Sequence, residues 1–455
     1  MAFKKVLILI GICLGVAVGA FIFSAVNTAL ASIQREFNAS INQLQWIMNI
    51  FGIVICSTLV IFGKLADLYG RKCLFLIGLI ALAISMFGSG IAFNIYWVIG
   101  SQAILGLSGA IIIPVSQALL SDTFPLHERS KAIGIWAAVM GLAMAIGPLL
   151  SGFIITLVGW RWIFLINIPI IFLSFILIVC FSSESQIQRK KISTIDLKGA
   201  FFLFFMVLTF VLAVIESDWP TYILIILYSL SAISLVFLWI TETHAEEPII
   251  QKQILRHRTF LSSSLSNFFL VFFNWACFFL LPLYLQNIHH FQPYQAGVLM
   301  LFITAPLTIF SFISGYLYQN LNPRTIILIG FIFLTISALI QTHLNEISNL
   351  INLIVSMLAF GIGWGLIWGP TITAATSSLP IEIAGVVAGT FVTIQEIGGT
   401  LGLAITGSIV RIHHNFLIGY HYGMWVLVLI CAMGFISTLF INISKNQSKP
   451  LARLK

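Results

Sequence analysis

Fourteen long apolar segments divide this chain of 455 residues. A helix needs about 20 apolar residues to cross the hydrocarbon of a bilayer, whereas a barrel strand needs about 10, with polar residues at alternate positions. The segments are longer than barrel strands and do not alternate, so the sequence predicts an all-α polytopic membrane protein with 14 transmembrane helices. The predicted spans lie near residues 6–30, 43–63, 73–93, 96–121, 132–158, 162–181, 199–215, 221–241, 260–286, 294–317, 325–342, 348–376, 384–410 and 420–443.

The few charges of the chain indicate how it is oriented. If the amino terminus is inside the cell, 19 of the 22 Lys and Arg residues fall in cytoplasmic segments, and only Arg35, Arg161 and Arg411 fall outside. Such an excess is typical of the cytoplasmic side of inner-membrane proteins. We therefore expect a bacterial inner-membrane protein with both termini in the cytoplasm. The first span, after Lys4 and Lys5, is too long for a signal peptide, and we expect it to be retained.

The composition argues against several other classes of protein. The net charge of +8 follows membrane orientation and does not predict nucleic-acid binding. The six cysteines are scattered, without the paired spacing of a metal, redox or disulfide site. The pairs His289–His290 and His413–His414 have no carboxylate or cysteine partners, so we expect no metal site. No phosphate loop, activated nucleophile or carboxylate pair is visible, and we expect neither an enzyme nor a cofactor.

A charged connection from Gly63 to Lys72 separates the second span from the third. It reads G-K-L-A-D-L-Y-G-R-K and carries four charges, which cannot lie in hydrocarbon. The stretch 315–324 aligns with it at an offset of 252 residues, with Gln319 in place of Asp67. This weak internal repeat is typical of a transporter built from two related halves.

The pattern G-x-L-A-D-x-x-G-R-K resembles the loop between the second and third spans of the major facilitator superfamily. Within the fifth span, Gly147, Pro148 and Gly152 resemble its antiporter motif G-x-x-x-G-P-x-x-G-G, with Ala143 and Ser151 in place of two glycines. Read without the family, this run is a kinked and closely packed helix. The segments 25–33 and 159–169 resemble the first span and the external connection between spans five and six of the fourteen-span drug:proton antiporter branch.

This resemblance implies a major facilitator fold of two six-helix bundles plus two inserted helices. We expect an N-terminal bundle over 1–198, two inserted spans with basic linkers over 199–258, and a C-terminal bundle over 259–455. The inserted spans carry no polar residue in mid-span that calls for a function, so we interpret them as structural. The substrate cavity is expected at the membrane midplane, between the bundles.

The chain departs from the branch in its charged pair. Ile22 stands where the branch has an acidic residue in the first span, and Gln102 stands where it has an arginine in the fourth; Ala31 replaces a proline. Loss of one partner would leave a charge in the membrane at a cost of about 2.5 kcal/mol or more. Loss of both avoids that cost, and the usual proton-coupling pair is absent.

Thirteen of the 14 acidic residues lie in loops or at the ends of spans, and Glu396 alone lies in mid-membrane. Helical rise places it about 18 Å from the start of its span, at a position where the branch usually has a neutral amide. Because removal from water penalises the charged form of a carboxyl group, Glu396 is the candidate for proton coupling. The alternative is a neutral glutamic acid that bonds to a neighbouring helix.

Two further groups of residues are candidate sites. The candidates for the substrate cavity are polar or aromatic residues of the spans, although intramembrane asparagines also serve as interhelical hydrogen-bonding groups: Asn27, Asn49, Gln102, Asn274, Trp364, Trp368, Thr393 and Gln395. The candidates for a cytoplasmic gate lie at the ends of spans two to five: Gly63, Asp67, Gly70, Arg71, Asp122 and Arg129. Within the gate, we expect Arg71 to pair with Asp122 and Asp67 to lie near a helix start in the second half.

The resemblance implies secondary active transport by alternating access, with proton-coupled export of small apolar or amphiphilic organic compounds. The missing charged pair keeps open a proton-independent facilitator or importer of a small organic solute. A transporter-like sensor without flux is a further alternative. The expected partners are a small-molecule substrate, protons and membrane lipid, and we expect a monomer.

Overall fold

The computed structural model describes residues 2–183, 196–244, 252–345, 350–379, 384–413 and 415–441. These residues form 16 helical segments, and no strand occurs among them. The helices are α1 (Ala2–Phe37), α2 (Ile41–Tyr69), α3 (Arg71–Gly90), α4 (Ile95–Thr123), α5 (Leu126–Val158), α6 (Trp162–Leu165), α7 (Asn167–Phe181), α8 (Leu197–Ile215), α9 (Thr221–His244), α10 (Lys252–Arg256), α11 (Arg258–Asn287), α12 (Pro293–Asn320), α13 (Pro323–Gln341), α14 (Leu350–Ser377), α15 (Ala384–Ile412) and α16 (Phe416–Leu439).

Thirteen helical stretches of the described chain are long and apolar enough to cross a membrane, with α6 and α7 counted as one. The fourteenth is α15, whose 29 residues are long enough to span a bilayer. It is less apolar than the others because it carries Gln395, Glu396 and four threonines. The predicted all-α polytopic architecture is thereby confirmed.

The charged connection between the second and third spans differs from the expected loop. Helix α2 continues through it as far as Tyr69, and α3 begins at Arg71. The chain reverses at Gly70 alone, whose φ of 101° is open to glycine at little cost. Charged residues can extend a helix beyond the hydrocarbon because water surrounds them there, so the apolar pattern marks the membrane boundary and not the helix end.

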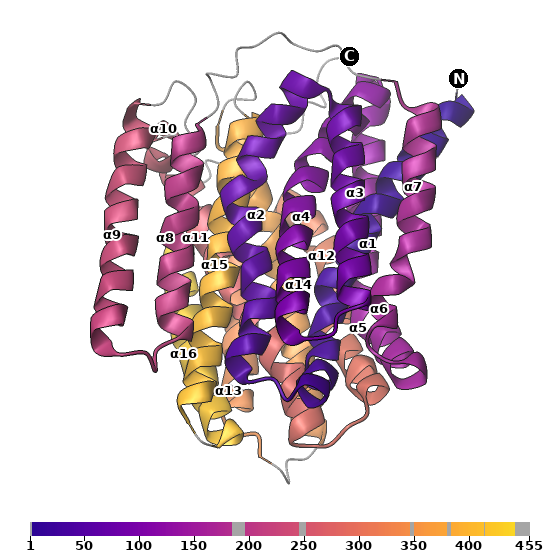
Figure 1. The fold of residues 1–455 in the computed structure, drawn as a ribbon. Coiled ribbons are helices and arrows are strands. Elements are labelled where there is room, and N and C mark those ends of the chain that lie inside the picture. The colour runs from indigo at the N-terminus through magenta and orange to yellow at the C-terminus, as the bar shows by residue number, and fades with distance from the viewer. Residues whose placement is uncertain are drawn as a thin grey trace.

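The spanning helices pack in two groups. Helices α1 to α7 contact mainly one another and form the first group, and α11 to α16 form the second. The groups meet where α2 packs on α15, α5 on α12, and α1 on α11. Helices α8 and α9 form a hairpin beside the bundle, and α8 contacts both α2 and α15, as Figure 1 shows.

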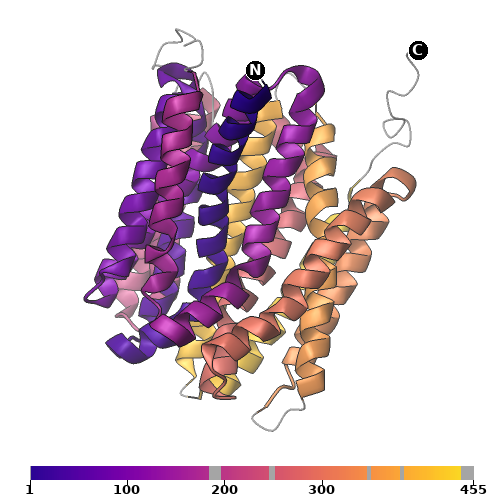
Figure 2. The same cartoon turned by 90° about the vertical axis from the view of Figure 1, so that its right-hand side faces the viewer.

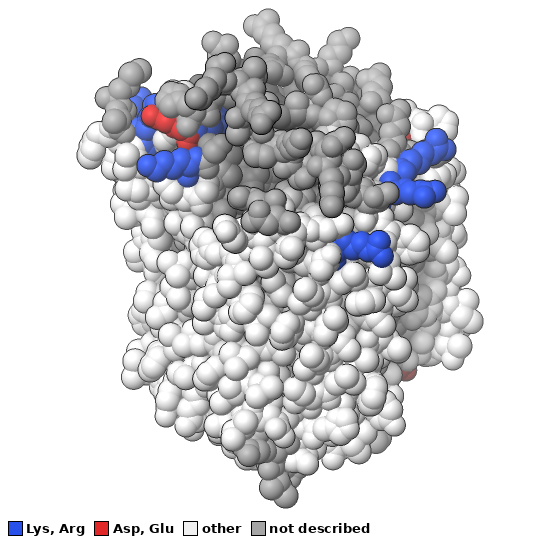
Figure 3. Space-filling model, turned by 180° about the vertical axis from the view of Figure 1, so that it is seen from behind, with Lys and Arg blue, Asp and Glu red and all other residues white. Residues whose placement is uncertain are grey.

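The molecule has two ends, which we name from the chain. Helix α1 starts at the amino-terminal face, and the turns after α1, α3, α5, α8 and α11 lie at the opposite face (Figures 1 and 2). On the side seen in Figure 3, Lys and Arg side chains lie in the half toward the amino-terminal face, and the described surface below them is almost entirely uncharged, with a little Asp or Glu at its right edge. This distribution fits a protein whose middle is embedded in lipid.

Candidate functional site

The predicted connection around Trp160 holds the first group together at the opposite face. The indole Nε1 of Trp160 donates to Oε2 of Glu36 at 2.7 Å, and Arg161 pairs with the same carboxylate at 2.6 Å. Arg161 also donates to the carbonyl of Ala92 at 2.8 Å. One dipeptide thus ties the end of α1 to the turn between α3 and α4, which explains why an arginine lies on this side.

Three of the predicted gate residues meet at the amino-terminal face. Arg71 Nη1 lies 2.5 Å from Asp122 Oδ1, as the sequence led us to expect, and Arg71 also donates to the carbonyl of Ala118 at 3.1 Å. Arg129 donates to the carbonyl of Ser121 at 2.6 Å. These contacts join α3 and α5 to the end of α4, all within the first group. The side chain of Asp67 lies outside the described part of the structure.

The glycines of the predicted antiporter motif allow α5 to approach two helices closely. A Cβ added to Gly147 would lie 1.9 Å from Ser24 Oγ of α1, and one added to Gly152 would lie 2.5 Å from the carbonyl oxygen of Pro293 in α12. From the side of α12, a Cβ added to Gly297 would lie very close to the carbonyl oxygen of Pro148 in α5. The motif therefore forms part of the contact between the two groups.

Three rings form an aromatic lid near the middle of the membrane: Phe23 of α1, Phe51 of α2 and Trp275 of α11. Their centroids are 5.6 Å apart for Phe23–Phe51, 5.2 Å for Phe23–Trp275 and 6.1 Å for Phe51–Trp275. Glycines make room for the indole, since a Cβ on Gly399 would lie 2.6 Å from its ring and one on Gly52 would lie 2.9 Å away. The lid joins the two groups at mid-membrane.

A second aromatic cluster lies on α14. The ring centroids of Trp364 and Trp368 are 5.8 Å apart, as expected for residues one turn apart. With the Asn274 amide oriented to satisfy both of its polar atoms, its oxygen accepts from Trp364 Nε1 at 3.0 Å and its nitrogen donates to the Leu270 carbonyl at 3.2 Å. The structure thus brings together three of the predicted cavity residues.

The amides predicted in the first half are almost fully buried. Asn27 donates to the carbonyl of Phe23 at 3.0 Å, but its oxygen finds no partner among the described residues. The same is true of both polar atoms of Asn49 and of Gln102 Nε2. A buried polar atom without a partner costs about 1–3 kcal/mol, so these amides can gain hydrogen bonds from a polar ligand or water.

Glu396 lies on the face of α15 that packs against α2. One helical turn further along the chain, Thr400 meets Gly52 of α2, where an added Cβ would lie close to the threonine oxygen. The carboxyl group accepts from Gln395 Nε2 at 3.0 Å, and it lies within electrostatic range of Cys56 of α2. Glu396 is partly exposed, whereas the flanking residues Thr393 and Thr400 are fully buried.

The carboxyl group and the lid are therefore neighbours. Since Trp275 sits against Gly399, three residues beyond Glu396 in the direction of the opposite face, Glu396 lies on the amino-terminal side of the lid. Four residues of this neighbourhood were not predicted as site residues from the sequence: Phe23, Phe51, Trp275 and Cys56. The glycines at 52 and 399, each in the middle of a span, were the available signal for a bulky partner.

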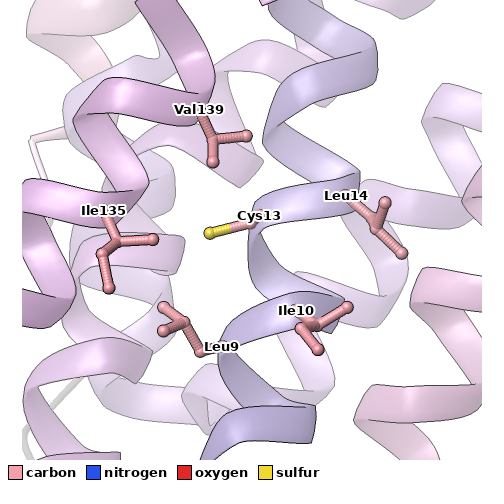
Figure 4. A pocket seen from close by; sticks show the side chains of 6 residues that line it. All are labelled: Leu9, Ile10, Cys13, Leu14, Ile135 and Val139. Atoms are coloured by element: carbon pink, nitrogen blue, oxygen red, sulfur yellow. The ribbon is translucent and has the colours of Figure 1, made fainter.

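A separate cavity of about 230 Å³ lies between α1 and α5. Figure 4 shows that apolar side chains and one thiol surround it: Leu9, Ile10, Cys13, Leu14, Ile135 and Val139. It contains none of the predicted site residues and is smaller than the roughly 300–1,000 Å³ of typical ligand pockets. We therefore do not assign it as the substrate site.

Comparison with known proteins gives relatives over most of the chain. The family model of the Major Facilitator Superfamily matches residues 12–403. The riboflavin transporter RibZ of Clostridioides difficile is 27% identical, over 98% of this chain and 99% of that protein. Multidrug resistance protein 3 of Bacillus subtilis is 29% identical, over 88% and 79%, and multidrug resistance protein Stp of Mycobacterium tuberculosis is 30% identical, over 84% and 72%.

Solved structures share the fold at low identity. A bacterial homologue of the human lysosomal transporter Spinster, in an inward-facing and unoccupied conformation, gives a TM-score of 0.65 at 16% identity, over 97% of this chain and 99% of that one. A peptide transporter of the POT type gives 0.69 at 16% identity, over 95% and 93%. With its two helix groups and a family match over most of its length, the chain belongs to the major facilitator superfamily of membrane transporters.

Proposed function

We propose that this protein is a proton-coupled exporter of small apolar or amphiphilic organic compounds, and that Glu396 carries the proton. The observation on which the proposal rests is the place of Glu396, a partly exposed residue with an ionisable side chain where α15 meets α2, beside the aromatic lid. An ionisable residue inside a membrane protein usually marks a pathway for ions or substrate. Relatives described as multidrug resistance proteins support the substrate class.

The contacts between the groups suggest which side is closed. Gln286 donates to the carbonyl of Thr28 at 3.0 Å, Asn287 to Gln34 at 3.2 Å, and the amide of Tyr294 to Thr156 at 3.3 Å. All these residues lie in the parts of their helices nearest the opposite face. We infer that the molecule is closed on that side and that Glu396 is reached from the amino-terminal side.

We propose that the amino-terminal face is cytoplasmic, in a bacterial inner membrane, because 19 of the 22 basic residues belong to it in a fourteen-span topology. The bundles 1–198 and 259–455 would rock as units in a monomer, with residues 199–258 between them. The contact between Arg71 and Asp122 would stiffen the first bundle at its cytoplasmic end, where Asp67 would meet the second bundle in the outward-open state. A cysteine at position 93 should react with an impermeant maleimide from outside; reaction only after permeabilisation would reverse the orientation.

A second candidate function is the uptake of a neutral, planar heteroaromatic compound of the flavin type. Two observations favour it. The acidic residue and the arginine of the drug:proton antiporter branch are replaced by Ile22 and Gln102, and the alignment with the riboflavin transporter covers 99% of that protein. The aromatic lid could stack on such a ring, while the unpartnered amides of Asn27 and Asn49 could bond its polar edge.

Flux measurements separate the two candidates, in inverted membrane vesicles for export and in whole cells for uptake. Export coupled to protons predicts that a planar aromatic cation such as ethidium accumulates when the interior is acidic, and that dissipation of the pH gradient abolishes this accumulation. Flavin uptake predicts riboflavin flux in whole cells that is unchanged by dissipation of the gradient. If neither compound is transported in any of these conditions, both candidates are wrong.

A further inference from the structure

The turn between α8 and α9 binds both helix groups at once. On one side, Glu216 accepts from Trp46 Nε1 at 3.1 Å and from Asn42 Nδ2 at 3.2 Å, both on α2. On the other side, Arg411 of α15 donates to Asp218 and Ser217. We name these contacts the clasp.

The clasp spans the line along which the two groups meet. Beneath it, Gln45 of α2 donates to the carbonyls of Leu403 and Ala404 of α15 at 3.2 and 3.0 Å. Ser408 of α15 donates to the carbonyl of Val214 in α8 at 2.8 Å. The hairpin is thus bonded to α2 and α15 at the end where these helices are also bonded to each other.

Below the turn, α8 covers the same line from the side. Its apolar face packs against Ile53 and Cys56 of α2 and Ala404 of α15, through residues that include Leu203, Val207 and Val211. An apolar helix packed here shields the neighbourhood of Glu396 from lipid, but the apolar contact can slide. The directional bonds of the turn cannot, because they fix particular atoms on both groups.

We infer that the inserted helices are not merely structural: the clasp is a set of positioning residues that favours the state closed on the opposite face. The inference rests on the proposed alternating access, in which α2 and α15 must separate at that face. Separation requires the turn to leave one of its two partners. The Arg411 side chain is 12% exposed and that of Asp218 is 74% exposed, so water can compete for this pair and the clasp can reopen.

The test measures the distance between the groups directly and needs no transport. Spin labels are placed at positions 157 and 418, two exposed sites at the opposite face in the first and second groups, on a chain without its six cysteines. Arg411→Ala and Asp218→Asn should each raise the fraction of long distances at least threefold over the parent. The exchange Arg411→Asp with Asp218→Arg should restore the parent distribution.

Arg161→Ala is the matched control, because it breaks an ion pair at the same face that lies within the first group. Its distance distribution should equal that of the parent. Distributions of Arg411→Ala and Asp218→Asn that superimpose on the parent would refute the clasp, as would an equal shift in Arg161→Ala or no recovery in the exchange. Asp218→Asn guards against misfolding because its side chain is largely in water. Failure of proton coupling would leave this result unaffected, so the two proposals can fail separately.

Discussion

At the scale of single residues, the buried polar groups fall into two kinds. Some are fully bonded, such as Asn274, whose amide bonds both Trp364 and the backbone. Others, such as Asn49, have no partner among the described residues. The first kind stabilises the fold, whereas the second kind can bind a ligand.

The bond between Asn274 and Trp364 gives a prediction for stability. Trp364→Phe removes the indole donor and leaves a buried amide oxygen unbonded, so the free energy of unfolding should fall by about 1–3 kcal/mol. Denaturant unfolding in detergent measures the change. In an Asn274→Leu background the same substitution should cost clearly less, because the unbonded oxygen is gone. Equal costs in the two backgrounds would contradict the bond.

His289, in the turn between α11 and α12, gives a prediction for pH. Burial and, secondarily, the neighbouring His290 hold its pKa below the ordinary value of 6.5. The neutral ring bonds Tyr284 at 3.0 Å and stacks on Phe291 with centroids 5.5 Å apart. As the pH falls, His289 is protonated in the unfolded chain before it is protonated in the folded protein. Its contribution to the free energy of unfolding is therefore complete above pH 6.5 and is lost as the pH falls through the lowered pKa of the folded state.

Histidine NMR titration measures this directly. The midpoint of His289 should lie below 6.5, and His289→Gln should remove the corresponding pH dependence of unfolding. A midpoint at or above 6.5 would contradict the assigned environment.

At the scale of helices, α5 shows how one element serves two contacts. Gly147 packs on α1 of its own group and Gly152 on α12 of the other, while an added Cβ on Gly141 would meet no atom within 4 Å. An added methyl group should therefore disturb the packing of α5 at Gly147 and Gly152 but not at Gly141.

This contrast gives a prediction for transport. Gly152→Ala should push α5 away from α12, and overpacking of this kind costs about 1–3 kcal/mol. If that cost falls only on the state closed at the opposite face, the ratio of the two states shifts by about 5- to 150-fold. The flux should fall accordingly, whereas Gly141→Ala should keep the parent flux. Equal flux in the two variants, at equal amounts of folded protein, would contradict the role of this contact.

The sequence was sufficient for some elements and not for others. The apolar segments predicted every span, including α15, because the hydrocarbon requires apolar length whatever the packing. They did not predict the extension of α2 to Tyr69, since a helix in water needs no apolar residues. Contacts such as Trp46 with Glu216, 170 residues apart, depend on how the hairpin packs, which local patterns do not encode.

The candidate site was predictable to a similar degree. Glu396 stood out because a carboxyl group in mid-span is costly and therefore rare. The pairing of Arg71 with Asp122 was also predicted. The burial of Asn49 at a helix contact was not predicted. The apolar pattern of a span does not tell which neutral amides face a cavity and which face another helix.

At the scale of the whole molecule, the two groups meet near the midplane through the lid, with Glu396 beside it. Toward the opposite face they are joined by Gln45, Gln286 and the clasp. Rocking about the lid would open this side and close the other. In that cycle Glu396 would face each side in turn, as a proton carrier must.

The most direct test is proton movement driven by substrate in proteoliposomes. With no pH gradient imposed, a gradient of ethidium should drive protons the other way through the parent protein, and an enclosed pH indicator reports them. Glu396→Gln keeps size and hydrogen bonding but has no proton to exchange; it should bind ethidium as the parent does and move no protons. Proton movement in Glu396→Gln equal to that of the parent would contradict the claim that this residue couples transport to protons.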